Sequence, residues 1–313
     1  MANPILRKKL DAKEFLVVPG VQDMIAAVMT KKVGFDIVYG SGYWLTASCL
    51  GLPDAGLATY TQMVDRMRTV AQTTGAALIA DADTGYGGLL NVHHTVRGYE
   101  AAGVTAIQLE DQEFPKKCGH TPYKRCIPTQ DMVDKIRVAV EAREDKENFL
   151  IIARTDARAS LGVDEAMRRM EAYAKAGADI LFFEAPQSEE EMRRACEAFD
   201  VPMLANMADG GKTPILPAKV LKEIGYALAI YPSMTSLVAA AAMEKALRKL
   251  KEEGISQSPD IDMFDFGEFC NLIGFPQVWE FEKRWARDDQ QPRSEAGRAA
   301  QGDTTIRNRA PIP

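Results

Sequence analysis

The sequence has no apolar stretch long enough to cross a membrane and no secretory signal pattern near residue 1. A transmembrane helix needs about 20 consecutive apolar residues, and no run of that length occurs in the 313-residue chain. The first ten residues are charged and lack the apolar core of a signal peptide. We therefore expect a cytoplasmic protein without membrane partners.

Cysteine is scarce, and basic residues do not cluster. The five cysteines are odd in number and irregularly spaced, so we expect reduced thiols rather than a disulfide framework. The net charge is −6, and Lys and Arg are dispersed along the chain. Nucleic-acid binding requires a concentrated basic face, so no nucleic-acid partner is expected.

Short apolar runs alternate with amphipathic segments along most of the chain. The apolar runs predict eight strands, at residues 16–19, 36–40, 77–83, 106–111, 149–156, 179–184, 201–206 and 227–231. Helical periodicity marks residues 24–32, 60–73, 92–102, 129–142, 164–176, 189–199 and 217–224. Apolar strands alternating with helices indicate a parallel sheet covered on both faces. Eight such units predict an α/β fold, the (β/α)8 TIM barrel, which needs about 250 residues.

The segments after the eighth strand differ in composition. Three helical segments follow, at residues 237–252, 262–273 and 276–286. The first is rich in alanine, and the last two carry enough Phe, Trp and Leu to predict a face buried on the barrel or on another subunit. We expect residues 1–286 to form one barrel domain with this extension. Residues 287–313 are polar and rich in Gly, Pro, Gln and Arg, and we expect them to be disordered. Gly103, Gly177 and Gly225 each follow a helical segment and are predicted to end it in the left-handed conformation.

Polar residues gather at the predicted carboxyl ends of the strands, where the active site of a (β/α)8 barrel lies. A single polar residue there is explained by a helix cap or a loop ion pair. Polar residues at seven strand ends instead predict a binding site. They are Tyr39, Ser41, Asp81, Asp83, Glu110, Asp111, Arg154, Asp156, Glu184, Asn206, Tyr231 and Ser233.

The carboxylates among these residues predict a metal site. Asp81 and Asp83 are two residues apart on a strand, so their side chains project to the same face. Glu110 arrives on the neighbouring strand end. Clustered carboxylates raise each other's pKa unless a cation neutralises them, and a cluster of oxygen ligands without histidine favours Mg2+ or Mn2+. The alternative, that Asp81 and Asp83 cap the next helix, is disfavoured by the glycines at 85, 87 and 88.

Residues 113–127 are too polar and too interrupted by proline for a helix, and they predict a mobile lid at a strand end. Cys118 is surrounded in sequence by Lys116, Lys117, His120, Lys124 and Arg125. Such cations are expected to lower the pKa of the thiol, which suits a proton-transfer residue. A zinc site at Cys118, His120 and Cys126 lacks a fourth ligand. A solvated loop explains the charges equally well from spacing alone.

Four segments together resemble the isocitrate lyase/phosphoenolpyruvate mutase superfamily, over about residues 5–286. They are Asp81-Ala-Asp-Thr-Gly-Tyr-Gly, Glu110-Asp-Gln, Lys116-Lys-Cys-Gly-His and Ala153-Arg-Thr-Asp. The Lys-Lys-Cys-Gly-His motif resembles the lyase branch, because the branches that break carbon–phosphorus bonds generally lack this cysteine. The resemblance implies a (β/α)8 barrel whose C-terminal helices are swapped between subunits of a homotetramer.

The resemblance also implies roles for individual residues. Asp83 resembles the direct Mg2+ ligand, with Asp81, Glu110 and Asp54 nearby. Cys118 resembles the acid/base of the lid, and Tyr39 resembles a pocket tyrosine. Further catalytic residues implied are Lys116, His120, Arg154 and Glu184. Substrate-binding residues implied are Ser41, Gly42, Tyr43, Gly119, Arg154 and Asn206.

Chain length and the residues after the motif narrow the substrate. Isocitrate lyases are much longer, and methylisocitrate lyases usually carry a basic residue after the motif, where this chain has Thr121-Pro122. The chain therefore resembles dimethylmalate lyase, petal death protein and oxaloacetate hydrolase more closely. We expect cleavage of a 2-hydroxy dicarboxylate to a 2-oxo acid and a carboxylate, with Cys118 protonating the leaving fragment. Tyr43, Trp44, Phe114, Pro232 and Ser233 are the expected pocket walls.

Three other functions stay open at this point. The first is a 2-methylisocitrate lyase. The second is an oxaloacetate hydrolase or decarboxylase that uses the same pocket. The third is a non-catalytic binding barrel, which the clustered carboxylates and the cysteine motif disfavour, since a scaffold gains nothing from them.

Overall fold

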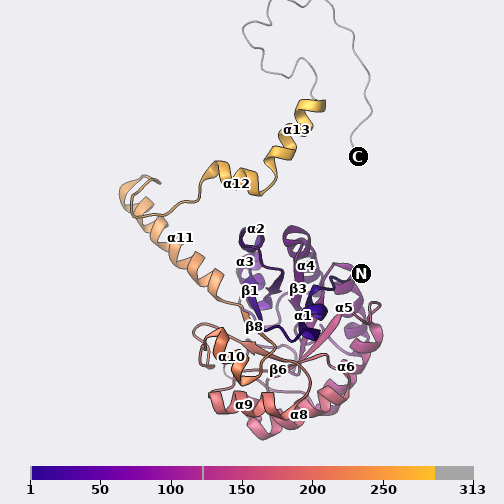
Figure 1. Ribbon diagram of the computed structural model, residues 1–313. Helices are drawn as coiled ribbons and strands as arrows, with labels where there is room; N and C mark the ends of the chain where they lie inside the picture. The colour runs from indigo at the N-terminus through magenta and orange to yellow at the C-terminus, as the bar shows by residue number, and fades with distance from the viewer. Residues whose placement is uncertain (1, 122, 286–313) are drawn as a thin grey trace, which may run out of the picture. The chain divides into compact units, whose positions relative to one another are not determined.

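The computed structural model describes residues 2–121 and 123–285, and its central feature is a closed barrel of parallel strands (Figure 1). The strands pair in chain order, and β1 pairs with β8 to close the barrel. Their bounds are β1 (Leu16–Val21), β2 (Ile37–Gly40), β3 (Ala77–Asp81), β4 (Ala106–Glu110), β5 (Leu150–Thr155), β6 (Ile180–Phe183), β7 (Met203–Asn206) and β8 (Leu228–Tyr231). All eight predicted strands are present with small shifts at their ends, so the predicted (β/α)8 barrel is confirmed.

The predicted helices connect these strands on the outside of the barrel (Figure 1). They are α2 (Met24–Val33), α4 (Tyr60–Thr74), α5 (Leu89–Ala101), α6 (Thr129–Ala142), α8 (Val163–Lys175), α9 (Glu189–Ala198) and α10 (Ala218–Ile224). A capping box between Thr59 and Gln62 starts α4. The three glycines predicted to follow helices do so with positive φ: 88° at Gly103, 103° at Gly177 and 114° at Gly225.

Three helices were not predicted: α1 (Ile5–Asp11), α3 (Gly42–Leu50) and α7 (Arg158–Leu161). In α1, Leu6 and Leu10 belong to the cluster that fills the barrel interior, and Arg7 pairs with Asp179 at 2.8 Å. The helix therefore packs against the barrel core as the first element of the chain. The apolar residues of α3 do not follow a helical period, so periodicity could not identify it.

Alternation along the strands separates an inner cluster from an outer one. Ile79, Ile152 and Phe182 belong to the inner cluster, whereas Leu78 and Ile151 pack outward against the helices. Because side chains alternate with period two, the residue two positions beyond an inner residue also points inward. This parity directs the polar side chains at the carboxyl ends into the barrel mouth: Asp81, Glu110, Arg154, Glu184 and Asn206.

The described chain divides into two compact units with a boundary after Asp262. In the first unit, α11 (Met234–Glu253) buries only Ser236 and exposes Leu237, Val238, Met243, Leu247 and Leu250. The second unit contains α12 (Phe266–Leu272) and α13 (Phe275–Trp285), with ring contacts such as Phe275 to Trp279. A single domain spanning residues 1–286 stays a prediction, and the expected disorder of residues 287–313 concerns a segment outside the described residues.

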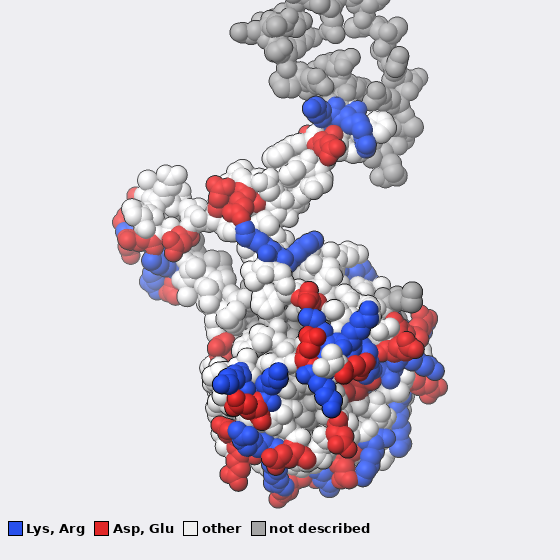
Figure 2. Space-filling view, viewed as in Figure 1, with Lys and Arg blue, Asp and Glu red and all other residues white. Residues whose placement is uncertain are grey.

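Acidic and basic side chains are interspersed over the visible face of the barrel (Figure 2). This distribution agrees with the dispersed charge of the sequence, because neither sign dominates that face. Across residues 2–121 and 123–285, we find no helix with the length and apolarity needed to traverse a bilayer.

Candidate active site

A cavity of about 370 Å³ opens at the carboxyl ends of the strands. Twelve of the fifteen predicted site residues line it: Tyr39, Ser41, Tyr43, Asp54, Asp81, Lys116, Cys118, Gly119, His120, Arg154, Glu184 and Asn206. The other three do not line the cavity but contact residues that do: Gly42 donates to Asp81, Asp83 pairs with Lys116, and Glu110 lies beside Arg154. The structure thus brings all fifteen residues to one place, and their individual roles stay predictions.

The first group in the cavity consists of carboxylates joined by a lysine. Lys116 Nζ lies 2.5 Å from Asp54 Oδ1 and 2.9 Å from Asp83 Oδ1, and its side chain is buried. Asp81 accepts hydrogen bonds from the backbone N–H groups of Gly42, at 3.2 Å, and Asp83, at 3.0 Å. Burial raises the pKa of Asp83 to about 6, against the lowering effect of Lys116. This group therefore concentrates negative charge that one lysine only partly balances.

Glu110 provides the test of whether these residues fit a metal ion. Both of its carboxylate oxygens are buried without a hydrogen-bond partner; Arg154 Nε lies 3.5 Å from Oε2, within ion-pair range only. Burial raises the pKa of Glu110 well above its usual range, because an ionised carboxylate without partners is costly inside a protein. No set of three or more Asp, Glu, His or Cys side chains is arranged around a metal position in the described part of the chain. Even so, the unpartnered oxygens and the all-oxygen donors fit a hard cation such as Mg2+.

The second group surrounds Arg154 on β5. Asp156 holds the guanidinium through two hydrogen bonds, 2.9 Å from Nε and 3.0 Å from Nη2. Asn206 Nδ2 donates to Glu184 Oε2 at 3.2 Å, and Asn206 Oδ1 is buried without a partner. Burial alone would raise the pKa of Glu184, but Arg154 and His120 bring it to about 2. A fixed arginine beside an unpartnered amide oxygen can bind a carboxylate and a neighbouring hydroxyl group.

The N-terminus of α3 contributes a further anion-binding element. Ser41 is its N-cap, and its side chain makes no capping hydrogen bond, so the hydroxyl group remains available to the cavity that it lines. Backbone N–H groups at a helix N-terminus favour negatively charged ligands. The predicted substrate-binding role of Ser41 and Gly42 therefore has a physical basis, although Gly42 N–H is already bonded to Asp81.

The predicted lid is a loop whose two ends are joined at its base. Gln112 and Cys126 form an antiparallel bridge, and Glu113 N–H donates to the carbonyl of Arg125 at 2.8 Å. The lid brings Cys118, Gly119 and His120 to the cavity. A Cβ atom on Gly119 would lie 2.4 Å from Arg154 Nη2 and 2.6 Å from Glu184 Oε1. Glycine at this position therefore allows the lid backbone to approach both charged groups.

The expectation that neighbouring cations lower the pKa of Cys118 is wrong. Burial raises the pKa of this thiol, and Glu184 raises it further. The cations are bonded elsewhere: Lys116 to Asp54 and Asp83, Lys124 to Asp156 at 2.8 Å, and Arg125 to Glu113 at 2.7 Å. Cys118 is consequently a protonated thiol near neutral pH, which suits a proton donor rather than a nucleophile.

Four of the five expected pocket walls line the cavity: Tyr43, Trp44, Pro232 and Ser233. The fifth, Phe114, is 64 % exposed and lines a separate pocket on the lid instead. Its prediction as a wall is therefore wrong, because the lid turns this side chain away from the strand ends. Leu237, at the start of α11, was not predicted and completes the apolar side of the cavity.

The sequence did not indicate that Lys124 and Asp111 hold the residues of the site in place. Buried Lys124 donates to the carbonyl of Gly119 and to Asp156, so it ties the lid to the residue that holds Arg154. Asp111 accepts hydrogen bonds from four donors: Thr155 Oγ1, the Asp156 N–H, Arg169 and Tyr173. The Glu-Asp and Arg-Thr-Asp strand ends were visible in the sequence, but their mutual bonding requires the barrel.

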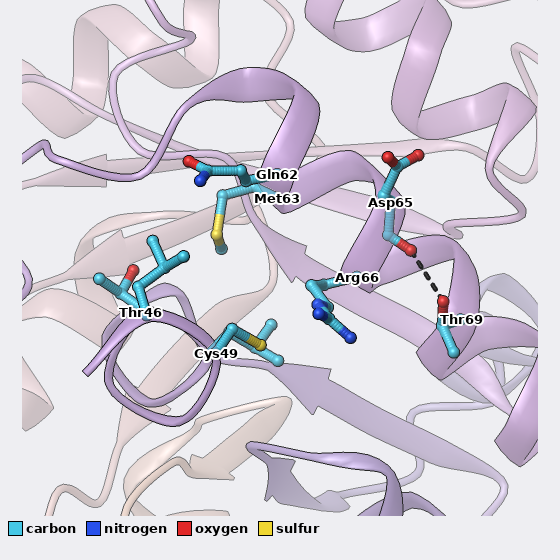
Figure 3. Close-up of a pocket in the computed structure, with 9 residues that line it drawn as sticks. Thr46, Cys49, Gln62, Met63, Asp65, Arg66 and Thr69 are labelled. Carbon is cyan, nitrogen blue, oxygen red and sulfur yellow. Dashed lines mark hydrogen bonds between the residues drawn. The ribbon is translucent and has the colours of Figure 1, made fainter. Parts of the chain in front are cut away.

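A second pocket of about 280 Å³ lies between α3 and α4, outside the strand ends. Figure 3 shows Thr46 and Cys49 from α3 opposite Met63 and Arg66 from α4. Asp65 and Thr69 are joined here by a hydrogen bond within α4 (Figure 3). This pocket is lined by residues of α3 and α4, so Cys49 is a thiol away from the candidate active site.

Comparison with known proteins identifies similar chains over most of this length. The profile of the phosphoenolpyruvate phosphomutase family matches residues 6–251. The chain is 44% identical to 2,3-dimethylmalate lyase of Eubacterium barkeri over 281 residues, covering 90% of this chain and 97% of that protein. It is 39% identical to 2-methylisocitrate lyase of Bacillus subtilis (strain 168), covering 90% of this chain and 92% of that protein.

Two solved structures have the same fold and superpose on most of this chain. Oxaloacetate acetylhydrolase in complex with 3,3-difluorooxalacetate superposes with a TM-score of 0.84 and 33% identity, covering 89% of this chain and 95% of that one. Phosphonopyruvate hydrolase in complex with oxalate and Mg2+ superposes with a TM-score of 0.81 and 29% identity, covering 92% and 100%. These similar proteins include both lyases and hydrolases.

Proposed function

Because the chain belongs to the phosphoenolpyruvate mutase/isocitrate lyase superfamily, we propose that it is a magnesium-dependent carbon–carbon lyase that cleaves a small 2-hydroxy dicarboxylate, an alkylmalate. The observation that carries this proposal is the place of Cys118, a protonated thiol that lines the same cavity as Arg154, Asn206 and the carboxylate group. Similarity to the lyases named above supports the reaction class.

The proposed reaction breaks the bond between C2 and C3 of the substrate. The C2 hydroxyl group loses its proton to one of the clustered carboxylates. Those of Asp54 and Asp81 line the cavity. Its electron pair forms the C2 carbonyl, and the electrons of the broken bond move to C3. Cys118 then donates its proton to C3, which yields a 2-oxo acid and a carboxylate. Arg154 orients the substrate and stabilises the charge that develops.

A magnesium ion held by Asp81, Asp83, Glu110 and Asp54 would supply fixed positive charge for the substrate oxygens. The lid excludes water from the cavity, which protects the carbanionic fragment until Cys118 protonates it. The apolar side of the cavity, formed by Trp44, Pro232 and Leu237, suits alkyl substituents better than a third carboxylate. This wall favours an alkylmalate over 2-methylisocitrate as the substrate.

The test is a panel of 2,3-dimethylmalate, 2-methylisocitrate, citramalate and oxaloacetate with Mg2+, with products detected by mass spectrometry. We expect pyruvate and propionate from 2,3-dimethylmalate to form fastest. EDTA should abolish turnover, and Mg2+ or Mn2+ should restore it. EDTA previously saturated with Mg2+ is the control for nonspecific effects of the chelator. Absence of turnover on the whole panel would contradict the proposal and favour a binding barrel.

Oxaloacetate hydrolysis is the second candidate, because the fold superposes closely on oxaloacetate acetylhydrolase. The panel separates the two reactions by their products. Oxalate and acetate would establish the hydrolase, whereas pyruvate and CO2 would indicate a decarboxylase.

We further propose that the active form is a cytoplasmic homotetramer in which subunits exchange their C-terminal helices. Val17 of β1 is 45 % exposed on the outside of the barrel, and α11 exposes most of its apolar residues within its own chain. A second copy of α11 would cover both surfaces. Sedimentation equilibrium is expected to give the mass of four chains. Substitution of Leu247 by Glu should reduce this mass, and a monomeric wild-type protein with full activity would rule the exchange out.

A further inference from the structure

The turn at residues 209–212, which follows β7, packs against the histidine of the lid. The backbone N–H of Lys212 lies 3.2 Å from His120 Nδ1. Gly211 N–H donates to the carbonyl of Ala208 at 2.9 Å, which closes the turn. Ser233 joins the turn to the end of β8, since its hydroxyl group accepts from Asp209 N–H and donates to Asp209 Oδ2, both at 2.9 Å. The turn is therefore held by its own bonds and presents a fixed donor to the lid.

These contacts determine which nitrogen of His120 carries the proton. A backbone N–H can only donate, so Nδ1 must accept and is unprotonated. Nε2 then carries the proton and donates to Glu184 Oε1 at 3.0 Å. The amide of Asn206 also donates to Glu184, so this carboxylate accepts hydrogen bonds from both His120 and Asn206. The imidazole thus bridges the turn after β7 and the carboxylate at the end of β6.

The arrangement requires residue 211 to have no side chain, as glycine does. A Cβ atom there would lie 2.8 Å from His120 Nδ1 and 2.9 Å from His120 Cε1, and 2.9 Å from the Ala208 carbonyl oxygen. The preceding Gly210 has a φ of +75°, and a Cβ atom on it would meet nothing within 4 Å. The two adjacent glycines therefore serve different purposes. Gly210 allows the backbone conformation, whereas Gly211 makes room for the imidazole.

We propose that Gly211 and the backbone N–H of Lys212 form a latch that holds the lid shut through His120. Cys118 lies two residues before His120 in the lid and lines the same cavity, so a displaced His120 would move the proton donor away from the substrate. Gly211 is thus a positioning residue rather than a catalytic one. The consequence for turnover rests on the proposed lyase function, but the position of the lid does not.

The test compares Gly211→Ala with Gly210→Ala and measures how fast iodoacetamide alkylates Cys118. Peptide mapping by mass spectrometry follows Cys118, with Cys49 in the outer pocket as the internal reference. We expect Gly211→Ala to speed Cys118 alkylation about tenfold, corresponding to about 1.4 kcal/mol, with Cys49 unchanged. The kcat of the lyase should fall by a similar factor. Gly210→Ala adds the same methyl group where no atom lies within 4 Å. It should change both quantities less than Gly211→Ala does, and its main effect should be a lower melting temperature, since alanine is strained at positive φ.

His120→Ala provides a second variant that cannot overpack the site. His120→Ala should speed Cys118 alkylation as much as Gly211→Ala does. In the double variant, Gly211→Ala should have no further effect, because the imidazole that its methyl group would contact is absent. Wild-type alkylation of Cys118 in Gly211→Ala would overturn the latch, and so would equal effects of the two glycine variants. A wild-type protein without lyase turnover would instead refute the proposed function, and the alkylation rates would still decide the latch.

Discussion

Replacement of Cys118 by serine is expected to lower the kcat of the lyase by about 10²- to 10⁴-fold, the usual contribution of a positioned general acid. The thiol lines the cavity beside Arg154 and Glu184, and its burial keeps it protonated near neutral pH. Serine has nearly the same shape, but its hydroxyl group is a much weaker acid than a thiol. The substrate should therefore still bind, with KM changed much less than kcat. Steady-state kinetics on the preferred substrate would measure both.

Cys49→Ser is the matched control for this substitution, because Cys49 lies in the pocket between α3 and α4. It should keep the wild-type kcat. A Cys118→Ser variant with full turnover would show that another group protonates the leaving fragment. It would not affect the assignment of the barrel or of the anion-binding residues, which depends on other contacts.

Replacement of Asp111 by alanine is expected to lower the free energy of unfolding by about 3–5 kcal/mol, the typical result of removing one partner of a buried ion pair. Asp111 is fully buried and accepts from Thr155, Asp156, Arg169 and Tyr173 at 2.8 to 3.0 Å. Its removal leaves these donors without an acceptor in a region that water cannot reach. Denaturant unfolding followed by circular dichroism would measure the loss.

Asp164→Ala tests whether the loss comes from burial rather than from the charge itself. Asp164 also pairs with an arginine, Arg194, but its side chain is 88% exposed. Exposed ion pairs contribute about 0–1 kcal/mol, so this variant should be nearly as stable as the wild type. Equal losses in the two variants would contradict the buried network around Asp111. We also expect Asp111→Ala to reduce turnover, since Asp156, which Asp111 holds through its N–H, orients Arg154.

Most of the barrel could be predicted because its signals are local. Strands β1 to β8 are apolar runs bounded by polar residues, and the helices between them have a clear apolar stripe, as α6 and α8 do. The signal failed where it was weak. The apolar residues of α3 lack a helical period, and α1 is only seven residues long, so neither could be separated from a loop.

The position of the site could also be predicted, because parity and direction follow from the strands themselves. Asp81, Glu110 and Arg154 each lie two residues after an inward side chain at the carboxyl end of a parallel strand. Their convergence required only that the barrel close. Phe114 failed for the opposite reason: a lid residue has no strand to set its direction, so its outward orientation could not be inferred.

The amino-acid sequence by itself determined the barrel, the rim that carries the polar residues and the identity of the lid residues, because each depends on order and spacing along the chain. Only the tertiary structure decided which charges meet. Lys116, Lys124 and Arg125 are neighbours of Cys118 in sequence, but each bonds to a carboxylate from another part of the chain or from the lid base. Which charges interact depends on their distances in the folded chain. Burial also removes the water that would solvate the charged form of Cys118. The pKa of Cys118 is therefore raised, although its sequence neighbours predicted the reverse.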